Sequence, residues 1–210
     1  MYNMKNLIGF IYCETNGLHQ TVPKNLADGR IINIIPPVKP TFKNMFRFAR
    51  VIVLNYLIGY YEDGQFIETN KERLILKPKS IEFEEEAMKY HGITMKKANK
   101  KGLDPTQVMK KFVNDFNYVN FIVFHNAEFH IKTIQAELMR TCFYYDFSKK
   151  KIIDIMSFNH NIKYPSLKNL SKEIVGNDYE NKSAKYNVTI VKKIFINLYK
   201  KYEKSITQSV

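Results

Sequence analysis

The chain contains no tryptophan and only two cysteines, Cys13 and Cys142. Two cysteines can form at most one disulfide, so a disulfide-rich scaffold and a cysteine-based zinc site are both excluded. No apolar run approaches the roughly 18 residues of a membrane span, and the short run from Leu7 to Cys13 lacks a small-residue cleavage pattern. We therefore expect an intracellular protein, cytoplasmic or within a host cell, that is neither secreted nor bound to a membrane.

Alanine is also scarce, whereas lysine, isoleucine and asparagine are abundant, which is typical of an AT-rich or viral genome. This bias weakens any argument from the number of lysines alone. Apolar residues still make up 45% of the 210 residues, enough to bury a core in one large or two small domains. Intrinsic disorder is therefore not expected.

Acidic residues are few relative to basic ones: 20 aspartates and glutamates stand against 33 lysines and arginines, a net charge of +13. Residues 21–50 carry six basic side chains and one acidic one, and residues 147–210 carry thirteen and five. Such concentration is typical of a nucleic-acid-binding surface, because each neutralised phosphate releases condensed counterions. A lysine-rich solvated surface in an AT-rich background explains the same numbers, and charge alone does not decide between the two.

The apolar periodicity predicts an α/β chain without internal repeats. Residues 21–47 contain four prolines and little regular pattern, so we expect an irregular basic insertion there. The remaining segments predict a single domain, residues 1–210, with one mixed sheet and helices packed against it. We expect strands at 7–12, 50–61, 65–76, 120–125 and 151–155, and helices at 83–91, 105–117, 128–139 and 167–175, with a basic C-terminal helix at about 184–204.

Three strings resemble the motifs of a known family. The run Ile11-Tyr12-Cys13-Glu14-Thr15-Asn16-Gly17-Leu18 resembles Asp-x-Glu-Thr-Thr-Gly-Leu, the opening motif of DnaQ-like 3′–5′ exonucleases of the DEDDh type. The run Phe124-His125-Asn126-Ala127-Glu128-Phe129-His130 resembles the second motif, and Lys182-Ser183-Ala184-Lys185-Tyr186-Asn187-Val188 falls where the third belongs. With Leu76-Lys77-Pro78, His91-Gly92-Ile93-Thr94, Ile153-Asp154 and Tyr164–Leu170 in the same order, the resemblance covers about residues 6–200. It implies an RNase H-like α/β fold.

The chemistry of that family needs two divalent metals held by four carboxylates, with a histidine as general base for the attacking water. The resemblance retains only one of these five catalytic positions, Glu14. The other four carry Tyr12, His130 and Asn187 in place of aspartates and Lys182 in place of the histidine. An imidazole, an amide and an ammonium group serve Mg²⁺ poorly. The resemblance therefore implies a catalytically inactive domain for which no cofactor is expected.

Other interpretations of the site remain open. A shifted third motif would use Asp178 in place of Asn187, although Ala184 and Val188 fit the unshifted register. Glu14 and His130, with Glu128, would suit one Zn²⁺ or Mn²⁺ ion, which leaves an active 3′–5′ exonuclease with a rearranged Mg²⁺ or Mn²⁺ site as the alternative function. For His130 we favour a helix residue that is hydrogen-bonded into the vacated pocket. A purely structural domain would fill the site with a salt bridge from Lys182 to Glu14.

The four substitutions also make the former metal cleft more positive than in the family. Lys182 would offer an ammonium group to a phosphate, and Tyr12 a hydroxyl and a stacking surface to a base. We expect Arg30, Arg47 and Arg50 of the insertion to flank this cleft and Asn126 to line it. The hypothesis is a binding or scaffold subunit for single-stranded nucleic acid, working beside a polymerase or other replication or repair proteins; an abandoned cleft without a role is the other possibility.

Overall fold

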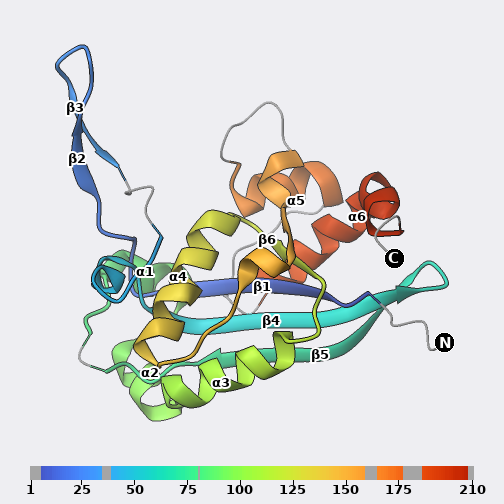
Figure 1. The fold of residues 1–210 in the computed structure, drawn as a ribbon, viewed down its shortest axis with the longest axis horizontal. Helices are drawn as coiled ribbons and strands as arrows, with labels where there is room; N and C mark the ends of the chain where they lie inside the picture. Colours follow the sequence, from blue (N-terminus) through green and yellow to red (C-terminus); the bar gives the residue numbers. More distant parts are fainter. Residues whose placement is uncertain (1–5, 35–38, 80, 159–164, 177–185, 208–210) are drawn as a thin grey trace.

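The central element is a five-stranded mixed sheet with the strand order β5-β4-β1-β6-β7. The computed structural model describes residues 6–34, 39–79, 81–158, 165–176 and 186–207 (Figure 1). β4 pairs antiparallel with both β1 and β5, whereas β6 pairs parallel with both β1 and β7. This arrangement confirms the predicted mixed sheet. The strand bounds are β1 Ile8–Thr15, β4 Val51–Glu62, β5 Gln65–Ile75, β6 Phe121–Phe124 and β7 Lys151–Asp154.

Helices cover both faces of the sheet (Figure 1). Successive side chains of β1 point to opposite faces, so Ile11 and Cys13 join one buried cluster while Phe10 and Tyr12 join another. The first cluster packs against α3 Pro105–Phe116 and α4 Ala127–Arg140, and the second against α5 Leu167–Val175 and α6 Asn187–Thr207. The alternation of β1 therefore decides which helices its site residues meet.

Two short helices, α1 Glu85–His91 and α2 Met95–Lys101, lie between β5 and α3. The sequence analysis predicted α1 but missed α2. Helix α2 is lysine-rich and buries only Ala98, so it has no apolar periodicity to reveal it. Its start is fixed by Thr94, whose side chain accepts a hydrogen bond from the Lys97 backbone N–H.

The basic insertion is more ordered than we expected. It contains β2 Val22–Asn25 and β3 Ile31–Ile34, which pair antiparallel as a separate two-stranded ribbon that extends away from the main sheet (Figure 1). The turn relies on Gly29, whose φ of +82° suits glycine, and on Asp28, which accepts hydrogen bonds from Arg30. Pro23 obscured the strand in the sequence, but an edge strand tolerates proline.

The insertion continues into a 3₁₀ helix, η1, at Met45–Arg47, and two further 3₁₀ helices are η2 Phe147–Lys149 and η3 Ile155–Phe158. The C-terminal helix begins at Asn187 within the described residues and reaches Thr207, three residues beyond the predicted end. Among the residues that the structure describes, no helix is both long and apolar enough to cross a membrane.

Candidate functional site

A cavity of about 450 Å³ lies where the parallel strands β1 and β6 end. Carboxyl ends of parallel strands commonly form binding crevices in α/β proteins. The β1 register shifts between Glu14 and Thr15, and such bulges are frequent beside active sites. We call this cavity the cleft; its described lining comes from the end of β1 and the loop after it, α1, and the start of α4: Tyr12, Cys13, Glu14, Thr15, Gly17, Leu18, Glu84, Glu86, Ala87, Tyr90, His91, His125, Asn126, Phe129 and His130.

Glu14 is only 3% exposed and faces the first residue of α6. The side-chain amide of Asn187 donates a hydrogen bond of 2.9 Å to Glu14 Oε1. Burial raises the pKa of Glu14 to about 7, while the Asn187 hydrogen bond and the charge of Arg73 act in the opposite direction. Close to neutral pH this carboxyl is therefore partly protonated, and one of its oxygens already accepts a hydrogen bond.

His130 is buried on α4, and its Nδ1 accepts a hydrogen bond from the Cys13 backbone N–H at 3.3 Å. Burial lowers the pKa of His130 to about 3, so the ring is neutral at physiological pH. A neutral imidazole whose Nδ1 accepts carries its proton on Nε2, and neither nitrogen then keeps a lone pair for a metal. His130 is thus a helix residue hydrogen-bonded into the pocket, as the sequence analysis favoured.

Tyr12 occupies the position of the first expected aspartate, but its ring is not an open stacking surface. The residue is 8% exposed, and its ring centroid lies 4.9 Å from that of His130. Its hydroxyl lies 3.5 Å from the hydroxyl of Tyr90 on α1. Tyr90 is 51% exposed, so it presents the accessible aromatic surface at the cleft.

The described lining of the cleft is not basic. It includes the carboxyl groups of Glu14, Glu84 and Glu86 but no lysine or arginine. Burial lowers the pKa of His91 and of His125, so these rings add little positive charge. The positive character that we expected depended on Lys182, which lies outside the described residues, as does Asp178 of the shifted register.

The described residues do not fit a two-metal centre. Within them, no group of three or more His, Cys, Asp or Glu side chains is placed to hold a metal. Glu84 and Glu86 are exposed, and Glu128 is turned to an ion pair of 2.6 Å with Lys132. The Oδ1 atom of Asn187 is buried and accepts no hydrogen bond among the described residues, but this one amide oxygen does not replace the missing carboxylates.

Asn126 lines the cleft, and its geometry also serves to start α4. Its φ of +67° is unusual for a residue other than glycine, and its side chain accepts a hydrogen bond from the Phe129 backbone N–H. Asp154 at the end of β7 holds this turn, because its carboxylate accepts hydrogen bonds from the backbone N–H groups of Asn126 and Ala127. Asn126 is therefore rigidly positioned.

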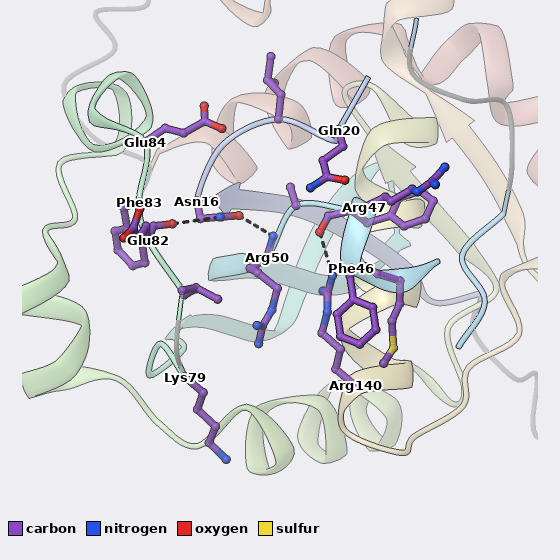
Figure 2. Close-up of a pocket in the computed structure, with 15 residues that line it drawn as sticks. Asn16, Gln20, Phe46, Arg47, Arg50, Lys79, Glu82, Phe83, Glu84 and Arg140 are labelled. Carbon is purple, nitrogen blue, oxygen red and sulfur yellow. Dashed lines mark hydrogen bonds between the residues drawn. The ribbon is translucent and has the colours of Figure 1, made fainter. Parts of the chain in front are cut away.

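None of the three arginines expected to flank the cleft is part of its described lining, although two of them lie in an adjoining cavity. Arg30 is at the β2–β3 turn, in an ion pair with Asp28. Arg47 and Arg50 line a neighbouring, larger cavity of about 860 Å³ (Figure 2). We call it the second cavity. Arg47 and Arg50 therefore lie next to the cleft, whereas Arg30 lies on the ribbon that extends away from the main sheet.

Sequence reasoning assigned no role to Tyr90 or His91 of α1, or to Phe46 and Arg140 of the second cavity. The string His91-Gly92-Ile93-Thr94 marked the end of α1 without a function. The alternation of aromatic and basic residues in Phe42-Lys43-Asn44-Met45-Phe46-Arg47 was the available signal for the second cavity.

No known family model matches the sequence, and no curated protein is significantly similar to it. Solved structures do match. The crystal structure of E. coli exonuclease I in complex with a dT13 oligonucleotide has a TM-score of 0.69 and 15% sequence identity, over 97% of this chain and 43% of that one. A product-bound structure of exonuclease I gives 0.68 and 14%, over 98% and 46%. The chain has the fold of the part of exonuclease I that it matches.

A complex of exonuclease I with SSB-Ct matches similarly, with a TM-score of 0.66 and 15% identity over 98% of this chain and 43% of that one. The exonuclease I fold confirms the predicted RNase H-like α/β class and the resemblance in architecture to DnaQ-like exonucleases. This chain spans less than half the length of the exonuclease I chains. The comparison establishes the fold, and the substituted catalytic positions stay a prediction from the sequence.

Proposed function

We propose that this chain is a degenerate 3′–5′ exonuclease domain that binds single-stranded nucleic acid without cleaving it. The observation that carries the proposal is the buried hydrogen bond of 2.9 Å from Asn187 to Glu14. It pairs the one retained carboxyl with an amide where the resemblance places the last metal-binding aspartate. In this view the domain is a binding or scaffold subunit beside a polymerase or other replication or repair proteins.

The loss of cleavage follows from what the two metals would have to do. They activate the water and stabilise the charge that develops at phosphorus during in-line displacement. Glu14 is partly protonated near neutral pH, His130 is neutral with Nδ1 engaged, and Tyr12 provides no carboxylate. Without the metals, the described cleft holds no cation that would stabilise the transition state.

Binding of a single strand is supported by the chain's charge and by its structural neighbours. The net charge of +13 favours a polyanion. Exonuclease I is bound to dT13 and dA16 oligonucleotides in two of the similar structures, and to SSB-Ct in another. The exposed Tyr90 ring offers a base a surface on which to stack, an interaction worth on the order of 1–3 kcal/mol per base.

Fluorescence anisotropy of a labelled oligothymidylate tests this proposal in the presence of EDTA. We expect binding that does not require Mg²⁺ and that weakens with salt at a slope of roughly −0.7 per phosphate contact. Tyr90→Ala should weaken binding by about tenfold, because it removes one stacking surface. Tyr118→Ala is the matched control, since Tyr118 is 75% exposed and does not line the cleft.

Binding that is lost in EDTA and restored by Mg²⁺ would show that the cleft still holds a functional metal. No binding to any single strand would show that the cleft has no nucleic-acid role. Either result contradicts the proposal.

A further inference from the structure

The second cavity adjoins the cleft and is the larger of the two, at about 860 Å³ against about 450 Å³. Leu18 and Glu84 line both cavities, so they meet at the loop that follows β1. Gly17 and His19 are buried on either side of Leu18, and Leu18 itself is 73% exposed. A ligand that leaves the cleft over Leu18 therefore enters the second cavity.

A buried carboxylate holds two arginines at one wall of this cavity. Glu137, whose side chain is 1% exposed, accepts hydrogen bonds from Arg50 Nε at 2.9 Å and Nη2 at 3.0 Å, and from Arg140 Nη1 at 3.0 Å. Two guanidinium groups share one carboxylate, which leaves an excess positive charge. The side chains of Arg50 and Arg140 are 20% and 9% exposed, so solvent screens this excess only partly.

The arginines are fixed in place before any ligand binds. Arg140 also donates hydrogen bonds to the backbone carbonyls of Met45 and Phe48, which ties the basic insertion to α4. Arg50 uses Nε and Nη2 in its hydrogen bonds to Glu137, and its Nη1 forms no hydrogen bond with the described residues. Arg47 lines the same cavity and is exposed. A planar guanidinium that is already oriented can bind a phosphate with little further ordering.

The exposed aromatic ring of Phe46 lines the second cavity together with these arginines. Phe46 is 73% exposed and precedes Arg47 in η1, and Phe42 is 67% exposed one turn earlier in the insertion. Large exposed aromatic residues interleaved with basic ones are typical of surfaces on which single-stranded bases stack. Phe46 therefore adds apolar surface, rather than more charge, to the positive wall.

The opposite wall carries two glutamates, and the one lysine on that side, Lys79, is held in an ion pair of 2.7 Å with Asp104. Figure 2 shows Glu82 and Glu84 on one side of the second cavity and Phe46, Arg47 and Arg140 on the other. Asn16 bridges the walls, because its side chain donates to the Glu82 carbonyl and accepts from the Arg50 backbone N–H. Such a polarised cavity suits a ligand that is anionic at one end and carries hydrogen-bond donors at the other.

We infer that the second cavity is a nucleotide subsite, in which Arg50 binds a phosphodiester of a single strand, Phe46 stacks on the adjoining base and Arg47, next to Phe46 in η1, contacts a neighbouring phosphate. The exocyclic amino groups of bases can donate to Glu82 and Glu84. An acidic peptide would also satisfy the arginines, but its carboxylates would meet those two glutamates across the cavity. This inference rests on the proposed function, because the strand is the one that leaves the cleft.

The test is fluorescence anisotropy of a labelled oligodeoxycytidylate, whose bases carry exocyclic amino groups, with the full chain in EDTA. Phe46→Ala combined with Arg47→Gln changes two exposed side chains, so the fold should persist. We expect binding to weaken by about tenfold or more and the salt slope to fall by roughly 0.7, for one lost stack and one lost phosphate contact. Tyr118→Ala combined with Lys110→Gln makes the same kind of change on an exposed surface away from both cavities, and should leave binding unaltered.

Three results would overturn the inference, and they can be told apart. If Tyr90→Ala weakens binding but the Phe46 and Arg47 variant does not, the strand occupies the cleft alone and the proposed function stands. If the wild type binds no strand, both proposals fail. If an oligoglutamate peptide binds as tightly as the strand, and the Phe46 and Arg47 variant loses this peptide binding, the cavity is a peptide or general anion site.

Discussion

Replacing Glu14 with glutamine should change how the stability of the fold depends on pH. Glutamine preserves the shape of the side chain and an oxygen that can accept the Asn187 hydrogen bond, but it removes the titrating proton. Burial raises the pKa of Glu14 from the ordinary value of 4.5 to about 7. Ionising the buried carboxyl therefore opposes folding, and the glutamine variant is free of this effect.

The sign and size follow from proton linkage. Between pH 4.5 and about 7 the folded chain holds the Glu14 proton more tightly than the unfolded chain, so stability falls as the pH rises. The difference between the two pKa values corresponds to about 3 kcal/mol of unfolding free energy. His19 and His130 act in the opposite direction, because burial lowers their pKa values to about 4 and about 3. Their contribution is common to both proteins and cancels in the comparison.

The assay is urea denaturation of the wild type and Glu14→Gln at about pH 5 and about pH 8, across the window in which Glu14 ionises. The wild type should lose about 2.5 kcal/mol relative to the variant between these two pH values. Glu86→Gln, an exposed carboxyl of the same cleft, is the control and should behave as the wild type. Parallel stability curves for Glu14→Gln and the wild type would refute the burial of Glu14 against Asn187.

Two further predictions concern the metal and the arginine wall. Asn187→Asp combined with His130→Asp should raise the affinity for Mn²⁺ in a calorimetric titration, because two carboxylates then join Glu14. Adding Glu14→Gln to this variant should abolish the gain in affinity. A titration that is the same as for the wild type would show that the motif alignment is wrong. Glu137→Gln should lower the unfolding free energy by about 3 kcal/mol in denaturant melts, because it leaves Arg50 and Arg140 without their shared buried partner. The control is Glu128→Gln, because the Glu128 side chain that pairs with Lys132 is exposed. This variant should change the unfolding free energy by less than about 1 kcal/mol. Equal effects would contradict the buried pairing.

The elements that the sequence predicted well have strong local signals. Helix α3 begins at Pro105 after Asp104, whose side chain caps it, and α5 spans residues 167–175 as expected. Helix α2 and the β2–β3 ribbon were missed, because lysines conceal the one and Pro23 and the short strand length conceal the other. Where the local sequence signal is weak, tertiary contacts determine whether a helix or strand forms, and the sequence pattern does not show these contacts.

The candidate site was predictable as a location and less so as an environment. The motif order correctly placed Glu14 and His130 at the same end of the sheet. The burial of Tyr12 and the pairing of Arg50 with Glu137, which are 87 residues apart, depend on packing between distant segments. For this reason the sequence analysis assigned Tyr12 a stacking surface, whereas the structure gives the exposed ring to Tyr90. It also did not predict the second cavity beside the cleft or the pairing of Arg50 with Glu137 there.

The central proposal is that this chain binds a single strand without cleaving it. The most direct measurement is gel analysis of a 5′-labelled single strand after long incubation with the purified chain and either Mg²⁺ or Mn²⁺, at a protein concentration that saturates binding. We predict that the strand stays full length while it remains bound. A ladder of products shortened from the 3′ end, which Glu14→Ala abolishes, would contradict the account and establish an active exonuclease with a rearranged metal site.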